Sequence, residues 1–286
     1  PLAVTHDGAG GAWVAYRARY DGFYMLWLGH VDADGACDKM QGIDNFGAMT
    51  SGEVAEVRMI PVGMHDVLLV WKQFGATPRL YAARVDLDGF VWHDPVTNTA
   101  VTDDVFRLVG DGQGGALVGY HVAGPPGEIR AQRIQGTNGT LLWNGLSGAL
   151  VWGSSLGAFG DIVRDGSGGA FLVRSDAGVA YAQHLNAAGS LVWGTELTVH
   201  DSQTPWFSLS TAPELCADGQ GGFVMVHGIE DLHVQRVDHT GTLVWGPTGV
   251  TVAAPVMIGG RHEIAPDRTG GAVVSYATLY DIDAST

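Results

Sequence analysis

The charged side chains with the clearest spacing occupy one position of a repeat. A glycine-rich string, Asp-Gly-x-Gly-Gly, recurs in full or weakened form from anchors at Asp7, Val62, Asp111, Asp165, Asp218 and Asp267. Four residues before these anchors stand Ala3, Arg58, Arg107, Asp161, Glu214 and Glu263. Carboxylate pairs can cleave glycosidic bonds, with an outcome set by their separation. A ring of mixed charge could instead hold a polar or zwitterionic ligand, or form salt bridges that close a channel.

A second set, nine residues after the anchors, is rich in rings. It consists of Tyr16, Trp71, Tyr120, Arg174, His227 and Tyr276. Aromatic faces stack on sugars, and the adjacent Lys72, His121 and Asp176 would add hydrogen bonds. As an alternative to sugar binding, aromatic rings at strand ends can pack over the end of the hydrophobic core. The long connection 200–213 contains Trp206 and could overhang this face, where a loop on a rigid scaffold is suited to binding, or it could tuck against the sheets.

Motifs for other chemistry are weak. The segment 262–266 begins His-Glu but lacks the second histidine of a helical zinc motif, and no Gly-x-Ser-x-Gly elbow occurs. Three aspartates within 31–38 could bind one calcium ion, but no other repeat continues the pattern. The two cysteines occupy non-equivalent positions. We therefore predict no catalytic residue, no cofactor and no metal site.

The anchors indicate hairpin turns. An apolar segment such as 106–110 precedes the string, and an alternating run such as 114–120 follows it, as expected for two paired strands. Aspartate can accept hydrogen bonds from nearby amides, and glycine tolerates positive φ. A phosphate-binding loop is the alternative, but the string lacks that spacing and precedes no helix.

A second motif follows in four repeats, at 83–92, 132–143, 183–193 and 235–245. Each copy predicts a third strand, a glycine turn and a fourth strand bearing Trp92, Trp143, Trp193 or Trp245. A tryptophan that recurs in register favours packing between neighbouring repeats over a row of ligand platforms.

Four strands about every 50 residues are typical of a β-propeller. With these motifs the chain resembles bacterial six-bladed β-propellers of the Asp-Gly-x-Gly-Gly and Gly-x-x-x-Trp type. It also distantly resembles quinoprotein dehydrogenase blades, closest at residues 238–245, without the quinone. The resemblance implies an all-β fold, a single domain 1–286 of four-stranded antiparallel blades, and first strands that line a channel. The expected repeats span about 1–53, 54–102, 103–157, 158–210, 211–259 and 260–286.

The last repeat is incomplete. It predicts strands near 263–265, 271–276 and 279–284 but no fourth strand. Its open edge could pair with a strand of another chain.

Composition narrows the function. Among 286 residues, 30 are acids and 15 are Lys or Arg, which gives a net charge of −15 and argues against nucleic acid or an anionic membrane as partner. No apolar run is long enough for membrane insertion. We predict a non-catalytic, extracellular or cell-surface module for ligand recognition, adhesion or assembly, with a glycan or another protein as partner. The alternatives are a carbohydrate-active hydrolase or lyase, and a subunit that pairs through the last repeat.

Overall fold

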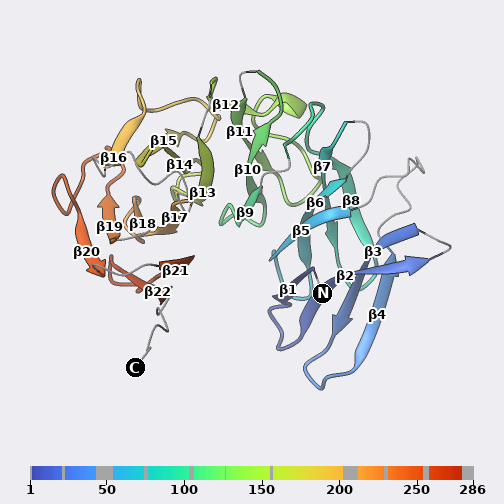
Figure 1. The fold of residues 1–286 in the computed structure, drawn as a ribbon. Helices are drawn as coiled ribbons and strands as arrows, with labels where there is room; N and C mark the ends of the chain where they lie inside the picture. Colours follow the sequence, from blue (N-terminus) through green and yellow to red (C-terminus); the bar gives the residue numbers. More distant parts are fainter. Residues whose placement is uncertain are drawn as a thin grey trace, which may run out of the picture. The chain divides into compact units, whose positions relative to one another are not determined.

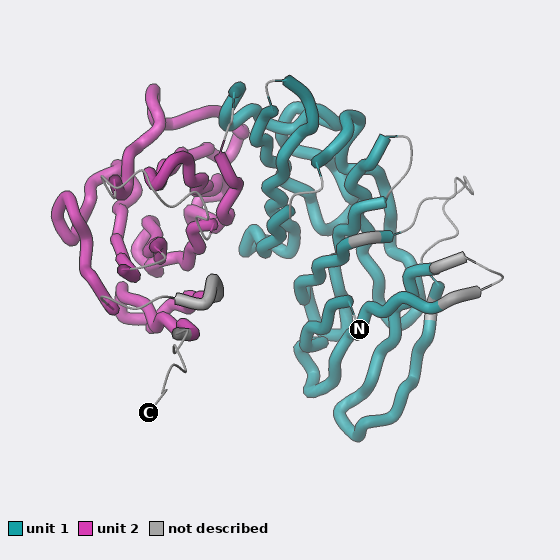
Figure 2. The backbone as a smooth tube through the Cα atoms, viewed as in Figure 1, with its two compact units in different colours: residues 1–154 teal, residues 155–286 magenta. Residues whose placement is uncertain are grey.

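The computed structural model contains strands, turns and one 3-10 turn among the residues it describes. These residues are 2–20, 23–42, 54–73, 77–102, 106–125, 127–154, 157–201, 212–228, 231–253 and 258–278. The chain divides into two compact units, residues 1–154 in teal and 155–286 in magenta in Figure 2. Within the described ranges, no helix has the length and apolar character needed to cross a bilayer.

The described part of unit 1 forms three four-stranded antiparallel sheets, each in chain order from edge to edge (Figure 1). The first contains β1 (Ala3–His6), β2 (Ala12–Tyr20), β3 (Phe23–Val31) and β4 (Cys37–Gly42). The second contains β5 (Val54–Pro61), β6 (Val67–Gln73), β7 (Arg79–Val85) and β8 (Phe90–Pro95). The third contains β9 (Arg107–Gly110), β10 (Ala116–Val122), β11 (Glu128–Ile134) and β12 (Ala149–Trp152), with the turn η1 (Gly145–Ser147) before its last strand.

The described part of unit 2 repeats this pattern with two four-stranded sheets and a two-stranded one. The fourth sheet contains β13 (Ala158–Arg164), β14 (Ala170–Asp176), β15 (Val179–Leu185) and β16 (Leu197–Asp201). The fifth contains β17 (Glu214–Ala217), β18 (Phe223–His227), β19 (Leu232–Val237) and β20 (Val250–Ala253). The last pairs β21 (Ile258–Pro266) with β22 (Ala272–Thr278), and the strand expected at 279–284 lies outside the described residues.

Neighbouring sheets meet through their first strands. In unit 1, β5 lies beside both β1 and β9, and in unit 2, β17 lies beside both β13 and β21. Sheets that meet along their first strands are the arrangement of propeller blades. The predicted all-β propeller fold is therefore confirmed, whereas the count of six blades stays a prediction.

The second strands β6, β10, β14 and β18 are buried on both faces, which their predicted alternation did not suggest. In β6, Leu68 and Val70 belong to a core shared with β10, whereas Val67 and Leu69 belong to a core shared with β2. The alternation thus separates two cores rather than core from solvent, because sheets cover both faces of a middle blade.

The anchor strings form the predicted turns. The Oδ1 atom of Asp111 accepts hydrogen bonds from the backbone N–H groups of Gln113 and Gly115, at 2.7 and 2.8 Å. Gly112 and Gly114 have φ of 78° and 81°, a conformation that favours glycine. The same pair of side-chain contacts recurs at Asp7, Asp165, Asp218 and Asp267. These turns are structural hairpins.

Trp92, Trp193 and Trp245 pack between neighbouring sheets, but three of the four repeated tryptophans do not lie on the fourth strand. Trp92 lies in β8 and donates to the carbonyl of Gly136 in the third sheet, at 2.7 Å. A Cβ on Gly139 would stand 2.7 Å from the Trp92 ring, so only glycine fits there. The fourth strands β12, β16 and β20 begin after Trp143, Trp193 and Trp245, and the segments before these tryptophans make single bridges at Leu141, Leu191 and Leu243. The fourth-strand positions predicted for these three repeats are therefore wrong.

Candidate functional site

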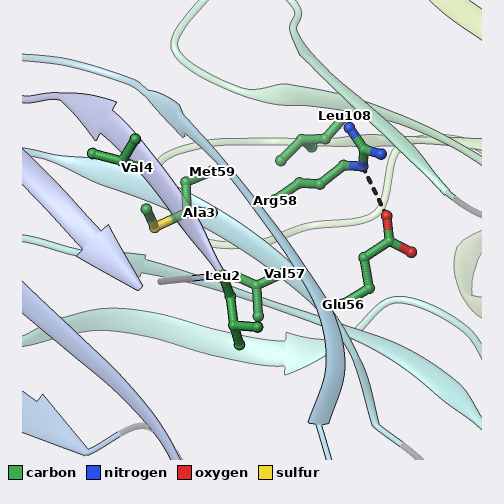
Figure 3. Close-up of a pocket in the computed structure, with 8 residues that line it drawn as sticks. All are labelled: Leu2, Ala3, Val4, Glu56, Val57, Arg58, Met59 and Leu108. Atoms are coloured by element: carbon green, nitrogen blue, oxygen red, sulfur yellow. Dashed lines mark hydrogen bonds and ion pairs between the residues drawn. The ribbon is translucent and has the colours of Figure 1, made fainter. Parts of the chain in front are cut away.

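Unit 1 has an open pocket along its first strands. It has a volume of about 380 Å³ and is drawn in Figure 3, with lining residues Leu2, Ala3, Val4, Glu56, Val57, Arg58, Met59 and Leu108. Most of its lining residues have apolar side chains, although the larger part of the exposed wall area is polar, and one ion pair supplies the charge. This pocket brings Ala3 and Arg58, two members of the predicted first-strand set, together.

Arg58 is held by a local carboxylate. Its Nε lies 3.1 Å from Glu56 Oε1, the dashed line in Figure 3, and the two side chains are 37% and 23% exposed. The guanidinium carbon also lies 5.8 Å from the centre of the Phe106 ring. Both charges reach solvent at the pocket. Arg107, on β9, is half-buried and has its own contacts.

The predicted carboxylates lie in unit 2 on adjacent strands, but they are not equivalent. Both oxygens of Asp161 accept backbone hydrogen bonds, Oδ1 from Ile162 at 2.8 Å and Oδ2 from Leu215 at 3.0 Å. Asp161 therefore ties β13 to β17. Glu214 is half-buried with contacts of its own, and Glu263 is exposed on β21. The charged ring, which needs residues of both units, stays a prediction.

The residue that follows each member of the first-strand set is apolar in all six repeats, which predicts packing between blades, but its burial varies along the chain. Ile162 and Leu215 are 3% and 7% exposed, as expected. Met59, Leu108 and Ile264 are half-buried, whereas Val4 is 67% exposed. The expectation is wrong for Val4, which adds apolar surface to the pocket.

The predicted ring-rich set is mostly buried. Trp71 and Tyr120 are 3% and 1% exposed and belong to cores, so stacking on a sugar would require these cores to open. Tyr16 is half-buried and Tyr276 is 41% exposed. Lys72 is buried and donates to the Thr102 carbonyl at 3.2 Å. Trp206 lies outside the described residues.

Arg174 has structural partners in its own sheet. Its Nη2 lies 3.0 Å from Glu196 Oε2 and its Nη1 lies 3.5 Å from Asp176. Its guanidinium carbon is 4.4 Å from the centre of the Tyr181 ring. These contacts, at 7% exposure, leave little of Arg174 open to a ligand.

His227 belongs to a group that the sequence did not suggest. We call His200, His227, His233 and His262 the unit 2 histidine cluster. The His200 ring centre is 5.6 Å from that of His227 and 4.4 Å from that of His233. Burial, followed by the neighbouring imidazoles, lowers the pKa of His227 to about 4. Burial also lowers the pKa values of His200, His233 and His262. The four histidines come from different strands, so no local spacing revealed them.

A basic residue in the third strand completes most anchor turns. The Oδ2 atom of the anchor aspartate lies 3.0 Å from a side-chain nitrogen in the pairs Asp111–Arg133, Asp165–His184 and Asp218–Arg236. In the second sheet, whose anchor is Val62, Arg84 instead pairs with Asp66. The sequence signal was an Arg or His at the second position of the second motif. This basic residue was not among the predicted contacts, because the prediction rested on the glycine and the tryptophan of the motif alone.

The first anchor has more partners than the others. Asp7 Oδ2 lies 3.1 Å from His30 Nε2 and 3.0 Å from His65 Nδ1, and His30 Nδ1 lies 2.6 Å from Asp38 Oδ1. Hydrogen bonds hold the pKa of Asp7 well below its usual range, against the opposing effect of burial. In decreasing order of effect, they come from the amide of Ala9, the His30 side chain, the amide of Gly11 and the His65 side chain.

The ligand atoms of Asp7, His30 and His65 all lie within 4.8 Å of one another, which is close enough to hold one metal ion. The calcium pattern over 31–38 does not form a shared site. Asp32 Oδ1 instead accepts the amides of Asp34 and Ala36, and Asp38 bonds His30.

Comparisons with known proteins support the fold and leave the activity open. No protein-family model and no curated protein sequence matches the chain. A crystal structure of a Lactobacillus plantarum protein superposes with a TM-score of 0.50 at 15% identity, over 96% of this chain and 74% of that one. A candidate 6-phosphogluconolactonase from Bacteroides fragilis gives 0.48 at 13% identity, over 96% and 72%. TolB from Acinetobacter baumannii gives 0.43 at 13%, over 96% and 62%. The chain is similar to β-propeller-like proteins in fold alone.

Proposed function

We propose that this chain is a non-catalytic recognition module whose unit 1 pocket binds an extended segment of a partner protein. The observation that carries the proposal is the exposed Arg58–Glu56 ion pair beside the apolar side chains of Leu2, Val4 and Met59. Peptide backbone offers a carbonyl to a guanidinium and an N–H to a carboxylate. An apolar side chain of the segment would cover Val4.

The lining favours peptide over glycan. Sugar sites rely on exposed aromatic faces, and the described wall of this pocket has none. Trp71 and Tyr120, the rings predicted to stack on sugar, are instead core residues. Leu2 and Val4 are 36% and 67% exposed, so they offer apolar area that contact with a protein would bury.

The state of the carboxylates supports a role without catalysis. Asp161 uses both oxygens to accept backbone N–H groups, which leaves it poorly placed as an acid or base. Glu263 is exposed, whereas the general acid of a glycosidase commonly lies in a shielded pocket. The composition, with two lysines among 286 residues and a net charge of −15, supports a further proposal that the module works outside the cytoplasm.

The test is a phage-displayed library of random peptides selected on the full chain. We expect selected peptides to carry a large apolar residue, and Val4→Asp or Arg58→Ala to weaken their binding about tenfold, a loss typical of a central contact. Val91→Asp and Arg164→Ala are matched controls, because both residues are exposed and neither lines this pocket. Peptides that bind the Val4 and Arg58 variants unchanged would overturn the proposal. So would a glycan retained on a glycan array, or turnover in a glycosidase screen that Glu214→Gln abolishes.

The last sheet offers a second candidate function. The described part of that sheet has only two strands, and β22 carries Val273 and Tyr276 at 63% and 41% exposure. A strand from a partner that paired with β22 would cover them. Protection from hydrogen exchange, in the isolated monomer, of the β22 amides that point away from β21 would contradict this assembly role.

A further inference from the structure

The turn at the first anchor differs from its equivalents in ways that point to a ligand. In the third, fourth and fifth sheets, one basic side chain faces Oδ2 of the anchor aspartate, namely Arg133, His184 or Arg236. At Asp7, two imidazoles share that oxygen, and a second carboxylate, Asp38, stands behind one of them. One histidine is enough to hold such a turn, as His184 shows. The additional groups at Asp7 are not needed for the hairpin.

We propose that Asp7, His30 and His65 form a binding site for a divalent transition-metal ion, with Zn²⁺ as the expected occupant. Two imidazole nitrogens and one carboxylate oxygen are a donor set that suits zinc, whereas Ca²⁺ and Mg²⁺ prefer oxygen ligands alone. Three protein ligands leave a fourth position of a tetrahedral ion for water or another small ligand.

Two of the three distances between ligand atoms are close to those around a bound ion, and the two histidine nitrogens lie within 4.8 Å of each other. Asp7 Oδ2 is 3.1 Å from His30 Nε2 and 3.0 Å from His65 Nδ1. Two ligand atoms bound to tetrahedral zinc at its usual bond lengths stand about 3.3 Å apart. A small outward movement of the two rings would therefore admit the ion.

The second sphere orients the ligands. The other carboxylate oxygen of Asp7 accepts the amides of Ala9 and Gly11, both at 2.8 Å, so Oδ2 is directed at the histidines. An imidazole of His30 that donates Nδ1–H to Asp38 presents the lone pair of Nε2 to the ion. Carboxylates behind metal-bound histidines commonly have this role.

The third ligand comes from another sheet and is fixed by the backbone. His65 lies in the turn between β5 and β6, with φ of 62°. Its N–H donates to the Asp7 carbonyl at 2.7 Å, and its carbonyl accepts Trp13 Nε1 at 3.2 Å. The turn of the second sheet is thus tied to the first before any ion binds.

The site is buried on one side and open on the other. Asp7 and His30 are 1% and 0% exposed, and the side chains of His65 and Asp38 are both 39% exposed. An ion can therefore enter from the side of His65. Bound zinc would also strengthen the contact between the first two sheets of unit 1.

The test uses the full chain, freed of metal by chelation and titrated with zinc chloride by calorimetry, with metal content measured after gel filtration. We expect about one zinc ion per chain. His65→Asn should weaken binding by about 100-fold or more, since outer partners alone are typically worth 10- to 100-fold. Asparagine tolerates positive φ, so the turn should be kept. Asp38→Asn should weaken binding by about 10- to 100-fold.

His184→Ala is the matched control, because it removes an equivalent histidine that has no second imidazole beside it. Cobalt(II) adds a direct readout, since a visible spectrum of tetrahedral type should appear in the wild type and be lost in His65→Asn. No zinc bound at about one ion per chain would overturn the proposal. Equal binding by the wild type and His65→Asn would also overturn it, because the other histidines would then be the ligands.

Discussion

Each unit contains a group of histidines, and the two groups have opposite surroundings. In unit 1, His30 and His65 share the carboxylate of Asp7, and His30 also contacts Asp38. In unit 2, the members of the histidine cluster lie mainly against one another, and burial lowers their pKa values. A buried imidazole beside a carboxylate has a favourable partner for a positive charge. A buried imidazole beside other imidazoles stays neutral.

The same contrast appears within the repeat. His30 and His184 occupy equivalent places in the third strands of their sheets, opposite Trp13 and Phe171. His184 meets one aspartate, whereas His30 meets two and has His65 nearby. The same repeat position thus provides a structural contact to the anchor aspartate in the fourth sheet, His184 to Asp165, and a candidate metal ligand in the first sheet, His30. The difference comes from the turn between β5 and β6, which brings the second imidazole, that of His65, to Asp7.

The largest expected effect is a loss of stability in acid caused by the unit 2 histidine cluster. The pKa of His227 is lowered to about 4, so between about pH 6.5 and 4 the unfolded chain binds more protons than the folded one. Stability must fall as pH falls through this window. From about pH 7 to about pH 4.5, His227 alone should remove about 2–3 kcal/mol, measured by urea unfolding.

His227→Gln should flatten this pH dependence, and His239→Gln, at an exposed turn position, is its control. The lowered pKa of Asp7 acts in a different window, because a carboxylate loses its contribution only at lower pH. A wild type whose stability is flat over the histidine window would contradict the contrast between the two groups.

The next effect concerns the contact between His184 and Asp165. His184→Ala should destabilise the fold by about 1–3 kcal/mol at neutral pH, because it leaves Asp165, which is 8% exposed, without its imidazole. Although burial raises the pKa of Asp165, hydrogen bonds from His184, Ser167 and Gly169 give a net lowering, which His184→Ala should partly reverse. A double-mutant cycle with Asp165→Asn separates this pair from the stacking of His184 on Phe171. A coupling energy near zero would show that the contact between His184 and Asp165 does not stabilise the fold.

The smallest effect is expected at His65 when no metal is present. His65→Asn should change the free energy of unfolding by no more than about 0.5 kcal/mol, since the side chain is 39% exposed and asparagine tolerates positive φ. Added zinc should raise the melting temperature of the wild type but not that of the variant. A large loss of stability without zinc would instead show that His65, like His184, is a structural partner of its anchor aspartate.

Local patterns were sufficient for much of the fold. The Asp-Gly-x-Gly-Gly strings predicted the hairpins because their hydrogen bonds join residues two and four positions apart. The tryptophans were predicted to pack between repeats, as Trp92 does against Gly139. The fourth strands beyond Trp143, Trp193 and Trp245 were misplaced, because turns separate them from the tryptophan and their sequences have no distinctive pattern.

The sequence by itself determined the repeat, its turns and the all-β propeller fold, because these depend on neighbours along the chain. Only the tertiary structure decided which side chains meet. His30 and His65 reach Asp7 from 23 and 58 residues away, and the two histidines stand in different sheets. The structure likewise places Trp71 and Tyr120, which were predicted to stack on sugars, in the hydrophobic core. The physical reason is that burial and convergence depend on how sheets pack against one another, which no local spacing records.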